Sequence, residues 1–112
     1  MPSKKRSKKP KRIKVLQLDF QELTVDVDKD NADPDPLGIQ VNETFVASAA
    51  NQCDMRFTDH VIFDDQHFPK NDRHFLRPKP GQTGEAFYYL VPFNSKARKT
   101  AIEATHSIKV GS

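Results

Sequence analysis

Apolar and polar residues alternate along much of this chain, which is the pattern of β-strands with one buried face. The alternation is clearest over residues 22–28, where the aliphatic side chains share one face. Between residues 13 and 20 the apolar positions change phase near Val15, and we expect a β-bulge there. Residues 30–38 hold turn-forming residues and two prolines, and since proline donates no hydrogen bond to a ladder, we expect a loop.

Strand-like segments resume at Ile39 and follow one another at short intervals. They cover residues 45–49, 53–57, 61–63, 74–76, 87–91 and 106–110. The segment 87–91 is apolar on both faces, so we expect it in the middle of a sheet. Asn94 and Ser95 are suitable caps for a short helix ending at residue 99 or 104. About seven to nine short strands with little helix predict an all-β protein, an antiparallel sandwich of two sheets.

The first fourteen residues carry eight positive charges and no acidic residue. Residues 1–12 contain too little apolar surface to build a core, so we predict a disordered basic arm there and a single β-sandwich domain over residues 13–112. The formal net charge of +3 divides into +8 for the first fourteen residues and −5 for the rest. The candidate polyanion-binding residues are Lys4, Lys5, Arg6, Lys8, Lys9, Lys11, Arg12 and Lys14.

A flexible cationic segment suits phosphate backbones, because each neutralised phosphate releases a condensed counterion. We expect non-specific binding of nucleic acid or another polyanion, helped by Tyr88, Arg73 and Arg77 where these are exposed. An anionic membrane surface is a second target for the arm, and in a nucleated cell the same run would serve as a nuclear import signal.

Residues 19–35 are strongly acidic, with seven carboxylates facing only Lys29. This composition leaves two alternatives open. The carboxylates form a solvated strand face followed by a loop, or they attract the basic arm and compete with outside anions.

Cys53 is the single cysteine, so the chain forms no internal disulfide, and a reducing cytoplasm suits it. The basic N-terminus is not followed by the apolar stretch of about 7 to 15 residues that a secretory signal needs, and no run approaches the roughly 18 residues of a membrane span. We therefore expect a cytoplasmic protein without membrane insertion.

Three segments resemble plastocyanin-type cupredoxins. Residues 59–65, which begin Asp-His-Val-Ile-Phe and are soon followed by a proline, resemble the strand and loop of the first copper-ligand histidine, here His60. Residues 79–89, with a proline-glycine turn and an aromatic run, resemble the strand that leads to the metal loop, and residues 106–110 resemble the terminal strand. The similarity covers residues 39–110 and implies a Greek-key sandwich of two antiparallel sheets.

The resemblance does not extend to the metal ligands. The family's Cys thiolate, second His and Met lie between the aromatic strand and the last strand, where this chain has Pro-Phe-Asn-Ser at residues 92–95. Blue copper needs the thiolate together with two imidazoles, so we expect no metal and no cofactor, and we place Cys53 in the core. A copper-binding electron-transfer protein with an atypical site near His60 is the alternative.

Two further alternatives concern metal and topology. A metal held by His67 with Asp64 and Asp65 would use hard and borderline ligands without a closed shell. An immunoglobulin-like or other sandwich topology would show the same alternation, because alternation does not reveal strand order.

Catalytic motifs are missing from the sequence. The adjacent residues Asp64 and Asp65 would point to opposite faces of a strand and would not share a substrate, and no phosphate loop or nucleophile motif is present. We therefore expect a non-enzymatic binding module, whose arm contacts polyanions such as nucleic acid and whose sheet faces or loops contact a protein partner.

Overall fold

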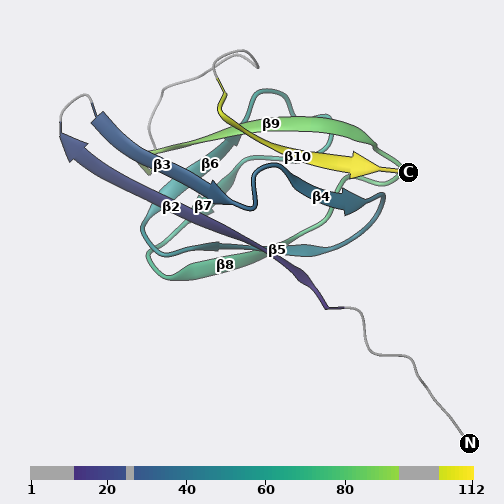
Figure 1. Ribbon diagram of the computed structural model, residues 1–112, viewed down its shortest axis with the longest axis horizontal. Helices are drawn as coiled ribbons and strands as arrows, with labels where there is room; N and C mark the ends of the chain where they lie inside the picture. Colours follow the sequence, from purple (N-terminus) through teal and green to yellow (C-terminus); the bar gives the residue numbers. More distant parts are fainter. Residues whose placement is uncertain (1–11, 25–26, 94–103) are drawn as a thin grey trace, which may run out of the picture.

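The computed structural model describes residues 12–24, 27–93 and 104–112, which form two β-sheets around one core (Figure 1). In strand order, the five-stranded sheet contains β4 (Leu37–Gln40), β10 (His106–Gly111), β9 (Gly84–Val91), β6 (Cys53–Phe57) and β7 (Gln66–Phe68). The four-stranded sheet contains β3 (Val27–Asp33), β2 (Lys14–Thr24), β5 (Phe45–Ala49) and β8 (Asp72–Leu76). The all-β, two-sheet class predicted from the alternation is confirmed.

Both sheets are mixed, which corrects the expectation of wholly antiparallel sheets. β2 runs parallel to β5, and β4 runs parallel to β10. A hairpin can join only antiparallel neighbours, and parallel neighbours need a longer crossover. Here the chain passes through β3 and β4 before it returns to β5 beside β2, and through most of the domain before β10 reaches β4. Apolar and polar residues can alternate in the same way in parallel and antiparallel strands, so the sequence pattern does not show strand direction.

The first two strands replace the single strand predicted over residues 22–28. β2 ends at Thr24, β3 begins at Val27, and these two residues are paired. β3 then runs back along β2 as far as the pair of Gln17 and Asp33. The alternation continues across the reversal, and for this reason the pattern alone predicts one strand.

The predicted bulge near Val15 is wrong. β2 pairs with β5 in continuous register over residues 14–18, and the irregularity in the β2–β3 pair lies between Glu22 and Thr24. The change of phase in the sequence has another cause. Val15 is an exposed apolar residue on the outer face of the sheet, whereas Leu16 begins the buried set on the inner face.

The connections between strands correct two further expectations. The predicted loop over residues 30–38 is reduced to residues 34–36, because β3 and β4 extend into it from both sides. Residues 61–63 form no strand; they belong to the connection from β6 to β7, from which Ile62 and Phe63 reach the core. The strand β7 escaped prediction because three residues are too short to show a period.

The remaining strand predictions are confirmed. Residues 45–49, 53–57, 74–76 and 106–110 all lie in strands, and β9 is internal to its sheet, between β10 and β6. The helix predicted after Asn94 falls mainly on residues outside the described ranges. So does the basic arm, apart from Arg12, which is exposed.

The core lies between the sheets and is filled by alternate residues of both. Phe57 stacks on Phe63 with ring centroids 5.2 Å apart, and its ring also meets that of Tyr88 at 5.6 Å. Cys53 is fully buried in this core, as predicted from its face of β6. Aromatic rings dominate the centre, and such pairs add packing energy beyond the area that they bury.

Gly84, the first residue of β9, has a φ of +119°, a conformation that residues with a side chain rarely adopt. A Cβ there would meet only the Ile62 side chain at 3.9 Å, so the strain lies in the backbone. We expect Gly84→Ala to lower the free energy of unfolding by about 1–3 kcal/mol in urea denaturation. Gly38→Ala is the control, because a Cβ at Gly38 meets nothing within 4 Å. Equal stability of the two variants would contradict the backbone argument.

Candidate functional site

His106 lies between two carboxylates where the chain crosses from one sheet to the other. Its Nε2–H donates to Asp30 on β3 and its Nδ1–H donates to Asp35 in the β3–β4 connection, both at 2.7 Å. The residue is 6% exposed. Because both acceptors are carboxylates, both ring nitrogens must carry protons, and the geometry defines an imidazolium. Burial alone would lower the pKa of His106, but the hydrogen bonds and charges of Asp30 and Asp35 outweigh it and raise the pKa.

Neighbouring groups extend this charged cluster. The Ser107 amide donates to the second oxygen of Asp35 at 3.1 Å, and the Ser107 hydroxyl donates to Glu85 at 2.6 Å. The ring of Tyr88 lies 5.3 Å from that of His106. Burial raises the pKa of Tyr88, and among the described residues its hydroxyl has no hydrogen-bond partner. An imidazolium with both nitrogens engaged is suited neither to accept a proton nor to bind a metal.

The acidic segment is therefore not the uniformly solvated face that was one of the two alternatives. Asp30 and Asp35 are hydrogen-bonded to His106, and Asp19 forms an ion pair with Lys29 at 2.8 Å. Nothing local in the sequence marks Asp30 and Asp35, since they are two acids among seven and lie more than seventy residues from His106.

The raised pKa makes the stability of the fold depend on pH. The folded state binds the His106 proton more tightly than the unfolded chain, whose ordinary value is 6.5. The stabilisation is fully present below that value and is lost as pH rises through the folded pKa. We expect urea denaturation across about pH 5.5–9.5 to show the free energy of unfolding falling with pH, with a smaller fall in His106→Gln.

Asp30→Asn is the matched test of the cause. It keeps the shape of the acceptor but removes one of the two charges that raise the folded pKa, so the fall should be smaller and should end at a lower pH than in the unmodified protein. Identical pH profiles for the unmodified protein, His106→Gln and Asp30→Asn would exclude the cluster as the source.

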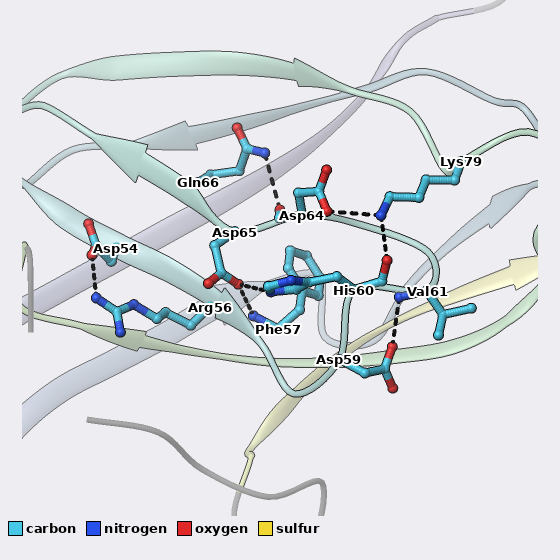
Figure 2. A network of polar contacts seen from close by, with 10 residues as sticks. All are labelled: Asp54, Arg56, Phe57, Asp59, His60, Val61, Asp64, Asp65, Gln66 and Lys79. Carbon is cyan, nitrogen blue, oxygen red and sulfur yellow. Dashed lines mark hydrogen bonds and ion pairs between the residues drawn. The ribbon is translucent and has the colours of Figure 1, made fainter. Parts of the chain in front are cut away.

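The connection between β6 and β7 holds a second polar network, drawn in Figure 2. One oxygen of Asp65 accepts the Phe57 amide at 2.8 Å and lies 2.9 Å from Nε2 of His60. Lys79 forms an ion pair with Asp64 at 2.9 Å and donates to the carbonyl of His60. These contacts tie an irregular segment to β6 and to the turn before β9, which is a structural role.

The donor atoms do not fit a copper site. His60 pairs with Asp65 in the loop, whereas Cys53 lies in the core, where burial first and then Asp54 and Asp30 raise the pKa of its thiol to about 12. A copper centre of this family's kind needs an ionised thiolate beside imidazoles. Within the described ranges, no three His, Cys, Asp or Glu side chains are grouped to hold a metal ion.

His67 does not meet Asp64 and Asp65, the residues with which it would form the alternative metal site. Its Nδ1–H instead donates to Asp54 at 2.7 Å. Asp54 is 0% exposed and also accepts from Arg56 at 2.9 Å, on the side of β6 opposite the core residues. This arrangement is a buried ion pair with a histidine at its rim.

Removal of Asp54 should be severe, because it takes a fully buried carboxylate away from the guanidinium of Arg56, which is itself mostly buried. We expect Asp54→Ala to lower the free energy of unfolding by about 3–5 kcal/mol. The double variant Asp54→Leu with Arg56→Met removes both charges and should lose less than the single variant. Urea denaturation of both checks this, and a double variant at least as unstable as Asp54→Ala would show that the charge is not the cause.

The outer face of the four-stranded sheet carries an exposed apolar strip. Val15, Val46 and Phe75 are neighbours in register across β2, β5 and β8. Phe75, on the edge strand, is 67% exposed, whereas Val46 between the other two is 4% exposed. Ile13 precedes this strip on β2's side and is also exposed. Exposed apolar residues gathered on one face mark an interaction surface more often than scattered ones do.

The charges on this face are unevenly distributed between its two edges. On the β8 side, Arg73 shares the face with Phe75, is exposed and makes no ion pair with any described residue. Arg77 follows β8, and its Nε–H donates to the carbonyl of Asn42 at 2.9 Å. The acids of the face, Asp19 and Asp33, belong to β2 and β3 toward the opposite edge. Asp72 of β8 alternates with Arg73 onto the opposite face and lies 3.3 Å from Nε2 of His74, so the outer face is cationic at its β8 edge.

The candidate polyanion-binding residues lie mostly outside the described ranges. Of the eight, Arg12 is exposed, and Lys14 donates to the carbonyl of Gly38 at 2.8 Å and lies 3.6 Å from Glu43. Tyr88 is fully buried, so the exposure on which its help in binding nucleic acid depended is not met. Phe75, which the sequence marks only as part of a strand-like run, is the exposed aromatic residue of this face.

A hollow of about 570 Å³ lies at one end of the sandwich, lined by Phe20, Gln21, Asn51, Gln52, Pro92 and Phe93. None of these described lining residues titrates near neutral pH or supplies a soft metal ligand. The hollow therefore offers amide and aromatic surface only.

No protein-family model matches this chain, and no curated protein sequence matches it. In the described ranges, no helix has both the length and the apolar character needed to cross a membrane. The proposed function therefore rests on the residues of this chain.

Proposed function

We propose that this chain is a non-enzymatic β-sandwich binding module whose N-terminal arm holds polyanions such as nucleic acid. The observation that carries the proposal is the concentration of eight cations and no acid in the first fourteen residues of a chain whose remainder is negative. Such a segment neutralises phosphates and gains affinity from counterion release. Without base-reading geometry it distinguishes sequences weakly.

The acids next to the arm in sequence are poor competitors for it. Asp30 and Asp35 neutralise His106, and Asp19 is paired with Lys29 at 2.8 Å. Three of the seven carboxylates between residues 19 and 35 thus already have cationic partners within the body. This supports the arm acting on outside anions, because its internal alternative is weakened.

The described side chains give little support to catalysis. The one histidine with a raised pKa has both nitrogens hydrogen-bonded to carboxylates. The thiol of Cys53 is buried, with its pKa raised to about 12, so it is a weak nucleophile. A free thiol suits a reducing compartment, and we propose the cytoplasm, or the nucleus in a nucleated cell, as the place of action.

The sandwich is, in our proposal, a Greek key of the cupredoxin-like kind. The supporting observation is the path of four successive strands. β6 pairs with β7, β8 follows in the other sheet and contacts β7 through the 2.9 Å hydrogen bond between Gln66 and His74, and β9 returns to lie beside β6. A Greek key has three consecutive hairpin-connected strands and a fourth beside the first, and here the step from β7 to β8 would cross between the two sheets.

Replacing the arm's charges tests the proposed function. In the test variant, Gln replaces Lys4, Lys5, Arg6, Lys8, Lys9 and Lys11. Fluorescence anisotropy with labelled single-stranded DNA at several salt concentrations should show weaker binding. The slope of log affinity against log salt should become shallower by up to about 4, if each lost cation had neutralised one phosphate.

The control keeps the composition of residues 3–11 and permutes their order. Because binding depends on charge and not on sequence, the permuted arm should bind as the original does. Equal affinity of the original and the Gln variant at low salt would remove the arm's role. Binding of the original to anionic lipid vesicles, but not to DNA, would assign the arm to membranes instead.

A further inference from the structure

We propose that the β8 edge of the four-stranded sheet is a stacking platform for single-stranded nucleic acid, with an unpaired base on Phe75 and phosphates beside Arg73 and Arg77. The inference rests on the proposed function, since the arm supplies the general attraction. It adds the class of polyanion and a second contact surface.

Phe75 is exposed and has apolar neighbours on the adjacent strands. Its ring is 67% exposed on an edge strand, in register with Val46 and, one strand further, with Val15. Three adjacent strands span about 10 Å, so Phe75 and Val15 lie about that far apart, with the buried Val46 between them. Bases stack on exposed aromatic rings of this kind in proteins that bind single strands, with little preference for sequence.

Positively charged residues precede and follow Phe75 in the sequence. Arg73 lies two residues from Phe75 on the same face and has no ion-pair partner in the described part of the chain. Arg77 lies two residues beyond Phe75, and its Nε–H is held by the carbonyl of Asn42. Cations on both sides of a stacking ring match a nucleotide strand, in which phosphates lie on both sides of each base.

An exposed ring on a sheet surface suits single strands better than duplexes. In a duplex the base faces are covered by their neighbours, so a ring standing on a sheet surface cannot stack on them. An edge strand with short flanking turns is also not shaped like the helix or ribbon that enters a major groove. Phe75 therefore adds affinity only for unpaired bases.

The position of the arm makes the two contacts cooperative. The arm joins the body at Arg12, three residues before Val15, which belongs to the same strip as Phe75. A strand held by the arm is thus kept at high local concentration near the platform, and the two contacts reinforce each other.

The test compares Phe75→Ala with the unmodified full-length protein. The probes are a labelled oligothymidylate of about twenty nucleotides and a duplex of the same length, at the same salt. Loss of one stacked base should weaken single-strand binding by about 5- to 100-fold and leave duplex binding unchanged. Phe75→Tyr, which keeps the ring, should bind as the unmodified protein does.

Phe93→Ala is the matched control, because Phe93 is another exposed aromatic residue but lies beyond the end of β9 in the other sheet. It should leave binding of both probes unchanged. Arg73→Gln and Arg77→Gln should each make the single-strand salt slope shallower by about 0.7. Thermal melting of each variant checks that it folds. Because Phe75 is exposed, its replacement should leave the melting temperature nearly unchanged.

Three outcomes would overturn the inference. If Phe75→Ala binds oligothymidylate as tightly as the original while the arm's Gln variant loses affinity, the platform fails and the proposed function stands. If neither variant changes binding, both fail. If Phe75→Ala changes only the oligomeric state, the strip is a contact between copies of this chain.

Discussion

The clamp of His106 between Asp30 and Asp35 connects the parts of this fold that no hairpin connects. Asp30 belongs to the four-stranded sheet, His106 begins β10 in the five-stranded sheet, and Asp35 lies in the three residues that lead from one to the other. Asp35 also accepts the Ser107 amide, immediately before the β4–β10 ladder begins with Leu37 opposite Ile108. A side-chain carboxylate thus starts the parallel pairing that the backbone continues. Because the ladder closes an edge of the sheet with a strand from early in the chain, this contact holds both ends of the described domain together.

The interior charges of the protein are largely satisfied within the protein. His106 has two carboxylates, and Asp54 has both Arg56 and His67. Such groups cost free energy to bury and are retained only with good partners. Because these groups are already paired within the protein, they are not available to bind a metal or a substrate. Our proposal therefore places binding of other molecules at exposed groups such as Arg73 and in the cationic N-terminal sequence.

The sequence predicts the parts of the fold that depend on local pattern. Residues 53–57 and 106–110 alternate cleanly, and the run 87–91, apolar on both faces, is internal to its sheet as expected. The end of β2 at Thr24 and the start of β3 at Val27 are not predictable in this way, because no glycine or asparagine stands there and the alternation continues from one strand to the next. The parallel pairs and the His106 clamp join residues that are distant in the chain, and no local period records them. The arm's charge is visible in composition, but the role that we propose for Phe75 depends on which face of β8 is outward, which only the register shows.

The proposed binding of polyanions by a chain of net charge +3 depends on the division between a neutralised interior and a cationic edge. Net charge alone is a weak guide, since the body without its first fourteen residues is negative and would repel phosphates at long range. Charges further apart than about 8–10 Å are screened at physiological salt, so the relevant quantity is the local arrangement. On the outer face, β8 lies two strand spacings from β2, about 9.5 Å, and three from β3, about 14 Å. The acids of β3 are therefore screened from a phosphate beside Arg73, and Asp19 of β2 is paired with Lys29 at 2.8 Å. In our proposal the cationic edge would therefore bind anions although the body as a whole is acidic.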